Sequence, residues 1–253
     1  EFRARMLGES YSAGGIAHTV AKTRAASDEV LRLNAESLFA EAYSSGTTTI
    51  ECKSGYGLTV DDEKRSLAIA QEFTDETTYL GAHVVPVEYK TNPKDYVDLV
   101  CGQMLDAALP HAKWIDVFCD KGAFSVEDAR TILQAGMKKG LLPRIHANQI
   151  QEGGGVKLGV ELAVASVDHV SHISVKDIEA LSKSKIVATL LPGAEFSTRS
   201  AYPDVRPLLE ASITVALASD CNPGSSYTTN MPLMIALAVR EMFFTPEQAL
   251  WSA

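Results

Sequence analysis

The chain has 253 residues, of which 46% are hydrophobic and 22% are charged, proportions that are typical of a folded globular domain. They exclude a collagen-like or largely disordered chain. The net charge of -9 repels nucleic-acid phosphates and anionic lipid headgroups, which argues against either as a partner.

The N-terminal sequence EFRARMLGES lacks the apolar stretch of a signal peptide, and no apolar run approaches the ~18 residues of a membrane span. The four cysteines, at positions 52, 101, 119 and 221, include no C-x-x-C pair. This spacing argues against a zinc ribbon or a redox motif and favours small core residues in a reducing cytoplasm. Because the chain starts without methionine and stops inside a helix-like segment, we expect it to be part of a longer protein.

The first element in chain order is an amphipathic helix. Its apolar residues recur with helical spacing at Leu31, Ala35, Leu38, Phe39 and Ala42. Capping patterns predict the starts of four further helices, at Thr59-x-x-Asp62, Ser125-x-x-Asp128, Ser174-x-x-Asp177 and Thr245-Pro246-x-Gln248.

Seven short runs of apolar and β-branched residues alternate with the helical segments. They are residues 46–53, 77–85, 114–120, 142–148, 166–172, 186–192 and 213–221. Several are apolar almost throughout, as strands covered on both faces are, which favours a parallel sheet. No linker or repeat interrupts the alternation, so we expect residues 1–253 to form a single α/β domain.

Seven βα units are one short of a (β/α)8 barrel of the TIM type, and a doubly wound open sheet is the alternative. Polar residues follow the ends of most predicted strands, whereas an open sheet concentrates its chemistry at one point. This distribution favours the barrel, with seven of its eight strands evident. The glycine cluster at 152–159 lacks the Gly-Lys-Ser/Thr ending of a phosphate-binding loop.

The stretch ECKSGYGLTV, residues 51–60, ends the first predicted strand with polar residues. Glu51 and Lys53 are two residues apart and face the same side of a strand, so we interpret them as an internal polar pair. Gly55 and Gly57 are expected to let the backbone bend around Tyr56, which would then reach the active-site mouth.

Three histidines and an aspartate are candidates for chemistry, because a closed barrel would bring them to one mouth. They are His83, His146, His169 and Asp220. Imidazole and carboxylate are ligands of catalytic zinc or iron alike, so the sequence does not choose between these metals. The other three histidines are interpreted as surface or loop residues: His18, His111 and His172.

Seven motifs, in order along nearly the whole chain, resemble the imidazolonepropionase family of the amidohydrolase superfamily. They are KSGYGL (53–58), GAHVVP (81–86), DVFCDKGAF (116–124), HANQ (146–149), DHVSH (168–172), LLPGAEF (190–196) and SDCNPGSS (219–226). The N-terminal pattern EF.AR..G.SY..GGI..TV..TRAAS, residues 1–27, is similar to the family as well. The resemblance implies a metal-dependent hydrolase barrel that opens the ring of 4-imidazolone-5-propanoate to give N-formimidoyl-L-glutamate.

The resemblance also implies residue roles. His146 and Asp220 would be two of the metal ligands, Asp220 would move the proton of the attacking water, and His169 would polarise the substrate carbonyl or steer that water. The substrate contacts that it implies are Tyr56, His83, Gln149, Asn222, Gly224 and Ser225. A homodimer is common among barrels of this superfamily and is expected here.

Two departures from the family pattern matter. The family's other two metal ligands form an H-x-H pair on the first barrel strand, and this chain contains no H-x-H. We therefore expect that strand, and the family's small β-domain, to lie outside the chain. Some members carry glutamate where this chain has Gln149, and an amide cannot act as a general base, so Gln149 should bind rather than catalyse.

Three alternatives stay open on the sequence. Another amidohydrolase, such as a nucleobase deaminase, would share the barrel, the metal and the aspartate. The segments KSGYG and NPGSS favour a carboxylate-bearing substrate, because backbone N–H groups, hydroxyls and a tyrosine suit an anion. An inert barrel fragment without metal, or a barrel isomerase of sugar phosphates, would also be compatible with parts of the pattern.

Overall fold

The computed structural model describes residue 3, residues 6–8 and residues 16–253. Residues 1–2, 4–5 and 9–15 of the N-terminal pattern quoted above therefore lie outside the described residues. The strands are β1 (Cys52–Lys53), β2 (Thr77–Ala82), β3 (Trp114–Cys119), β4 (Leu142–Pro143), β5 (Ile145–Ala147), β6 (Ser166–His169), β7 (Val187–Leu190) and β8 (Val215–Leu217).

Helices occupy most of the segments between the strands. They are α2 (Ala17–Ala25), α3 (Asp28–Ser44), α4 (Val60–Gln71), the 3-10 helix η2 (Val87–Tyr89), α5 (Pro93–Cys101), α6 (Gln103–Ala108), α7 (Val126–Lys138), α8 (Gly155–Leu162), α9 (Val175–Ser182), α10 (Pro192–Thr198), α11 (Arg206–Glu210), α12 (Met231–Glu241) and α13 (Pro246–Ser252). Among the described residues no helix is long and apolar enough to cross a membrane.

All seven predicted strand regions contain a strand. The fourth is divided at Arg144 into β4 and β5, both of which pair with β3. The first prediction was too long, because only Cys52–Lys53 of residues 46–53 pairs in the sheet. Residues 47–51 lack a paired strand on either side despite their β-branched side chains, and they line a cavity instead.

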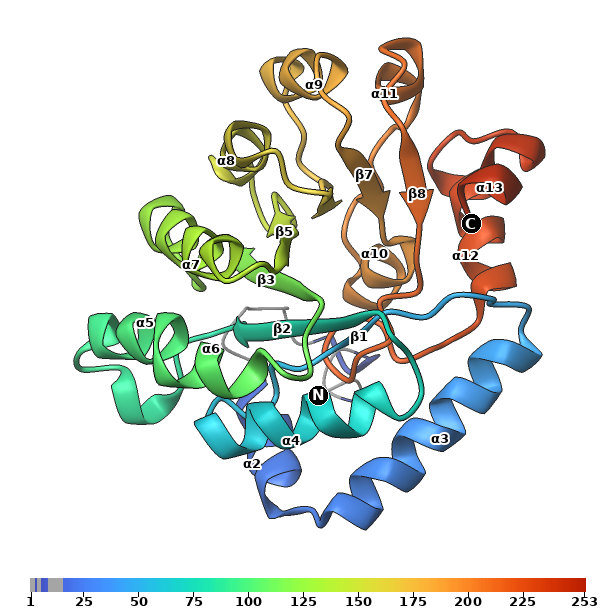
Figure 1. Ribbon diagram of the computed structural model, residues 1–253. Helices are drawn as coiled ribbons and strands as arrows, with labels where there is room; N and C mark the ends of the chain where they lie inside the picture. The colour runs from blue at the N-terminus through green and yellow to red at the C-terminus, as the bar shows by residue number, and fades with distance from the viewer. Residues whose placement is uncertain (1–2, 4–5, 9–15) are drawn as a thin grey trace.

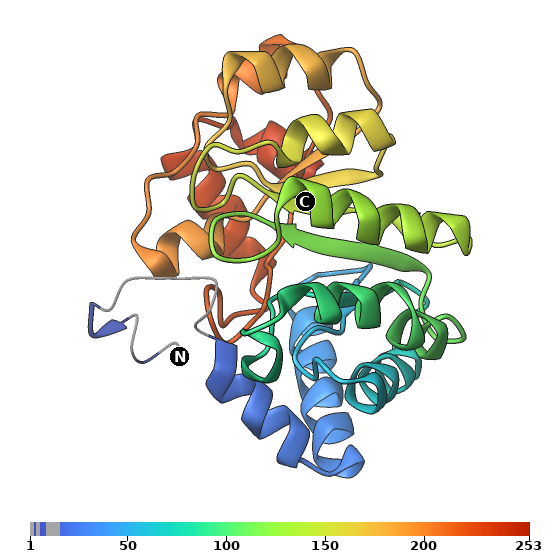
Figure 2. The same cartoon turned by 90° about the vertical axis from the view of Figure 1, so that its left-hand side faces the viewer.

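Every pairing between these strands is parallel, and the order from β1 to β8 follows the chain without a reversal. The sheet curls, and most of the helices lie on its outer side (Figures 1 and 2). A doubly wound sheet reverses its strand order and carries helices on both faces, so this arrangement is that of a barrel. In the described part of the chain, β1 pairs only with β2 and β8 only with β7.

All four predicted capping residues begin a helix, and each side chain accepts a hydrogen bond from the backbone three residues later. Only Ser174 and Thr245 begin complete capping boxes, in which the side chain three residues later also accepts the backbone N–H of the capping residue. At Thr59 and Ser125 the cap hydroxyl donates to the following aspartate side chain, and the backbone half of the box is not formed. The cap thus depends on the hydroxyl, which the sequence pattern identifies correctly.

Candidate active site

One cavity of about 990 Å³ occupies the inside of the curled sheet and extends towards the ends of α3, α12 and α13. All nine side chains or glycines predicted for the site line it: Tyr56, His83, His146, Gln149, His169, Asp220, Asn222, Gly224 and Ser225. They come from the ends of β1, β2, β5, β6 and β8, because parallel strands deliver their C-terminal residues to one edge of the sheet.

The aromatic rings along one wall form a continuous series. Tyr56 meets His83 edge to face at 5.1 Å between ring centroids, and Phe118 lies between His83 and His146 at 6.1 and 5.9 Å. The His146 and His169 rings are 5.3 Å apart. The three predicted histidines therefore do converge.

The three histidines differ in charge. Burial and the neighbouring His146 lower the pKa of His83 to about 4. The same two influences lower the pKa of His169 well below its usual value. Burial also acts against the charged form of His146, but the adjacent Asp116 outweighs it and raises its pKa. His83 and His169 are therefore neutral rings, whereas the neighbouring carboxylate of Asp116 favours the protonated form of His146.

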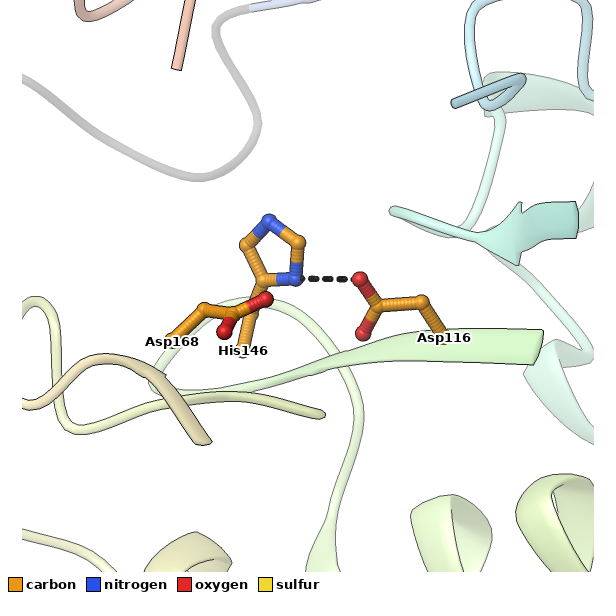
Figure 3. Close-up of side chains that lie close together, drawn as sticks. All are labelled: Asp116, His146 and Asp168. Carbon is orange, nitrogen blue, oxygen red and sulfur yellow. Dashed lines mark ion pairs between the residues drawn. The ribbon is translucent and has the colours of Figure 1, made fainter. Parts of the chain in front are cut away.

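Asp116 was not singled out from the sequence. It is fully buried on β3, and its Oδ2 lies 2.9 Å from His146 Nδ1 and 2.9 Å from Lys53 Nζ (Figure 3). Lys53 Nζ also donates to Glu51 at 2.8 Å, which confirms the predicted internal pair. The sequence signal for Asp116 was an acidic residue inside an apolar strand, which needs a partner when buried.

In the described part of the chain, one group of three possible ligand residues has its ligand atoms within 4.8 Å of one another: Asp116, His146 and Asp168. Its donors are of the types that zinc and iron take. Lys53 Nζ lies 2.9 Å from Asp116 and 3.9 Å from Asp168, so an ammonium already balances part of the negative charge of this group. His146 and Asp220 line the cavity together, but the described residues place no third ligand with them.

Asp220 follows β8 and has a left-handed backbone, with φ of 47°. Burial raises its pKa to about 6, although His146 and Lys53 act in the opposite direction. A carboxyl group with this pKa can both take and return a proton near neutral pH.

Asn222 organises the loop after Asp220. Its Nδ2 donates to the Asp220 carbonyl and Oδ2 and to Ser225 Oγ, at 2.7, 3.0 and 2.9 Å. Its Oδ1 accepts the N–H groups of Gly224 and Ser225, both at 2.8 Å. These two N–H groups are thus already bonded, so the anion site expected from NPGSS is not formed by them in this conformation.

Glu63 was also missed, and Asp120, a polar residue at the end of a predicted strand, was given no role in the site. Each holds a segment that carries a predicted site residue. The buried Glu63 accepts the N–H groups of Gly55, Gly57 and Leu58 at 2.7 to 2.9 Å and so fixes the turn around Tyr56. The predicted bend at the two glycines is confirmed.

Gly55 has φ of 106° and a Cβ on Gly57 would lie 2.4 Å from the Asp62 Cβ, so neither position tolerates a side chain. Asp120 Oδ2 accepts the N–H groups of Gln149 and Ile150 at 2.7 and 2.9 Å, which positions Gln149 at the mouth.

Glu195, which sequence reasoning also missed, is buried on α10. Ser171 Oγ donates to it, and burial raises its pKa to about 7. It borders a second cavity of about 230 Å³, together with Gln149 and His172. The remaining predictions about histidines are confirmed, since His18 and His172 are exposed and His111 lies in a turn.

The glycine cluster forms the start of α8. A Cβ on Gly155 would approach the Ala147 Cβ to 2.7 Å, so this glycine permits close packing of helix against strand. Close packing of α8 against β5 therefore explains the glycine at position 155, and no bound phosphate is needed to explain it.

A comparison with models of known protein families finds no match. Solved structures with a similar fold include a guanine deaminase from C. acetobutylicum with bound guanine, at 14% identity and a TM-score of 0.66, covering 93% of this chain and 62% of that one. Another is Arabidopsis ADAL complexed with IMP, at 10% identity and a TM-score of 0.68, covering 90% and 71%. At these identities the likeness shows the barrel fold alone.

The sequence relatives are much closer. The imidazolonepropionase of Mycolicibacterium smegmatis is 62% identical over 253 residues, which are 100% of this chain and 64% of the relative. That of Salinispora tropica is 62% identical over 255 residues, covering 100% of this chain and 65% of the relative. The chain thus spans slightly less than two thirds of their length, and over all of its residues it is similar to these imidazolonepropionases.

Proposed function

We propose that the chain carries the barrel active site of an enzyme that hydrolyses the cyclic amide C–N bond of 4-imidazolone-5-propanoate, giving N-formimidoyl-L-glutamate. The observation that carries this proposal is the meeting of all nine predicted site residues in one cavity, in a chain 62% identical to an imidazolonepropionase. Residues 1–253 would be one metal-dependent hydrolase barrel domain.

His146 and Asp220 would hold one zinc or iron ion as two ligands of a larger set. Their donor types fit such a metal, and Asp220 and His146 both line the cavity. A metal bound there supplies a Lewis acid, which makes a water molecule more acidic and polarises a carbonyl.

Asp220, with its pKa of about 6, would accept the proton of the attacking water and return it to the leaving ring nitrogen. His169 would donate a hydrogen bond to the carbonyl oxygen, because its lowered pKa keeps the ring neutral and leaves one N–H available. These two residues are the proposed catalytic groups.

Tyr56, His83 and Gln149 would contact the substrate at the mouth of the cavity. His83 Nδ1 donates to the Gly55 carbonyl at 3.0 Å, which leaves Nε2 as an acceptor for a substrate N–H. In the NPGSS loop, Asn222 and Gly224 would position the hydroxyl of Ser225 for contact with the substrate.

We also propose a cytoplasmic homodimer without a nucleic-acid or membrane partner. The four cysteines are free, as a reducing compartment requires, and the net charge of -9 disfavours polyanionic surfaces. Light scattering coupled to gel filtration tests the dimer.

The decisive experiment uses a chimera, because the relatives are longer than this chain. The matching segment of the M. smegmatis relative is replaced by these 253 residues, metal content is measured, and loss of imidazolone propionate is followed by its ultraviolet absorbance. Turnover that Asp220→Asn abolishes supports the proposal. A folded chimera without turnover, beside an active parent relative, refutes it, and deamination of guanine in its place favours a deaminase.

A further inference from the structure

The carboxylate of Asp116 has each of its oxygens engaged. Oδ1 accepts the N–H of Val117 at 2.7 Å, which fixes the rotation of the group. Oδ2 faces two neighbours, Lys53 Nζ at 2.9 Å and His146 Nδ1 at 2.9 Å (Figure 3). The side chain is fully buried, so no solvent competes for these positions.

Lys53 fixes the charge state of this group. Its ammonium lies between Glu51 Oε1 at 2.8 Å and Asp116 Oδ2 at 2.9 Å, with Asp168 Oδ2 further away at 3.9 Å. The ammonium of Lys53, 2.9 Å from Asp116 Oδ2, favours the ionised form of that carboxyl group. Asp116 is therefore a carboxylate, and a carboxylate oxygen can only accept.

This geometry determines which nitrogen of His146 carries the ring proton. Nδ1 lies 2.9 Å from Asp116 Oδ2. A lone pair on Nδ1 would face the negative charge of that carboxylate, so we expect the proton on Nδ1. When the ring is neutral, Nε2 is then left with its lone pair, and Figure 3 shows that Nε2 points away from both aspartates. His146 also lines the large cavity, so the lone pair is available to a ligand there.

We propose that Asp116, held by Lys53 and the Val117 N–H, is a positioning residue that fixes His146 in its Nδ1–H tautomer and turns the Nε2 lone pair towards the cavity. The inference rests on the proposed role of His146 as a metal ligand. A histidine that ligates through one nitrogen is commonly oriented by a carboxylate on the other.

A competing interpretation is that Asp116, His146 and Asp168 themselves bind a cation, since their ligand atoms lie within 4.8 Å of one another. The ammonium of Lys53 already contacts one of these carboxylates and approaches the other. A metal ion would have to displace it and would leave Lys53 buried beside a second cation. The positioning role needs no such rearrangement.

The test is the tautomer of His146 in metal-free protein labelled with ¹⁵N-histidine. Long-range ¹H–¹⁵N spectra are recorded with rising pH until the His146 ring is neutral, and His146→Gln identifies its signals. We expect Nδ1 at the shift of a protonated nitrogen and Nε2 at that of an unprotonated one. The reverse assignment in the unsubstituted protein overturns the proposal, and this measurement requires no variant of Asp116 to fold.

Asp116→Ala supplies the second arm. Without the acceptor, the proton is expected to move to Nε2, so the Nε2 signal shifts into the protonated range. A folded Asp116→Ala protein that keeps the Nδ1–H tautomer overturns the positioning role.

The matched control is Asp120→Ala, which removes a carboxylate just after the same strand that touches the backbone of residues 149–150 rather than His146. Its His146 tautomer should be unchanged, and a shift equal to that of Asp116→Ala would overturn the specific role of Asp116. Neither metal nor substrate is present in these samples, so failure of the hydrolase proposal in the chimera would be seen separately.

Discussion

Replacing Glu63 with glutamine is expected to destabilise the turn that presents Tyr56. The Glu63 carboxylate lies at the start of α4, fully buried, and accepts three backbone N–H groups. Oε1 takes those of Gly57 and Leu58, at 2.9 and 2.7 Å, and Oε2 takes that of Gly55 at 2.8 Å. Glutamine keeps the shape of the side chain but has one oxygen instead of two.

The magnitude follows from these contacts. With the amide oxygen at the Oε1 position, two bonds persist in weaker, uncharged form, and the NH2 group faces the Gly55 N–H. A buried donor left without an acceptor costs about 1–3 kcal/mol. Burial already raises the pKa of Glu63, so removing the charge recovers part of the desolvation cost. We expect a net loss of about 2 kcal/mol in the free energy of unfolding.

Urea unfolding monitored by circular dichroism measures this loss, with the m-value expected to stay constant. Glu36→Gln, at an exposed position on α3, is the matched control and should change stability by less than about 0.5 kcal/mol. A change that small in Glu63→Gln would refute the reasoning, because it would mean that the carboxylate does not hold the turn. The Gly55 carbonyl also receives the His83 Nδ1–H, so the His83 environment should change together with stability.

Three further outcomes are expected. Glu195 has a pKa of about 7 against an ordinary 4.5, so the folded state binds the extra proton and stability falls as pH rises between these values. Glu195→Gln, which mimics the protonated acid, should gain up to about 3 kcal/mol over the unsubstituted protein at pH about 8 and nothing at pH about 4 in urea titrations; equal stability at both would contradict the shift. Gly57→Ala should lose about 1–3 kcal/mol in the same assay, because its Cβ would meet the Asp62 Cβ at 2.4 Å, whereas Gly153→Ala, with its nearest atom at 3.6 Å, should be tolerated. In the chimera, Tyr56→Phe should weaken substrate binding by about 0.5–3 kcal/mol, seen as a raised KM, and unchanged kinetics would remove Tyr56 from the site.

The strands could be predicted because each is a local run of apolar and β-branched residues with a helix start on one side. The error at residues 46–51 has the same origin. A β-branched run such as Thr47-Thr48-Thr49 favours extended backbone, but a strand also requires a partner from elsewhere in the chain, and local sequence does not report one.

The site could be predicted in position for a similar reason. In a parallel barrel the residues at and shortly after the C-terminal end of each strand lie at the same mouth, so strand ends alone place His83, His146 and Asp220 together. Their supporting residues could not be found in this way. Lys53 and Asp116 are 63 residues apart in sequence, and nothing local indicates that a lysine on β1 neutralises an aspartate on β3.

Backbone strain marks the same mouth independently of any motif. Asn148, His169 and Asp220 have left-handed φ angles of 56°, 77° and 47° at or just after the ends of β5, β6 and β8. Such conformations cost on the order of 1 kcal/mol or more each for residues other than glycine, and they persist only where the surrounding structure holds them.

The end of β6 indicates what the strain accomplishes. In a regular strand, consecutive side chains point to opposite faces, so Asp168 and His169 could not both face the inside of the barrel. Both nevertheless line the same cavity, with Asp168 3.9 Å from Lys53 and His169 against the His146 ring. The left-handed turn at His169 ends the alternation and brings the second side chain back to the interior. One strand thereby supplies two polar groups to the cavity, one to the buried charge network and one to the proposed reaction, which extended backbone alone could not provide.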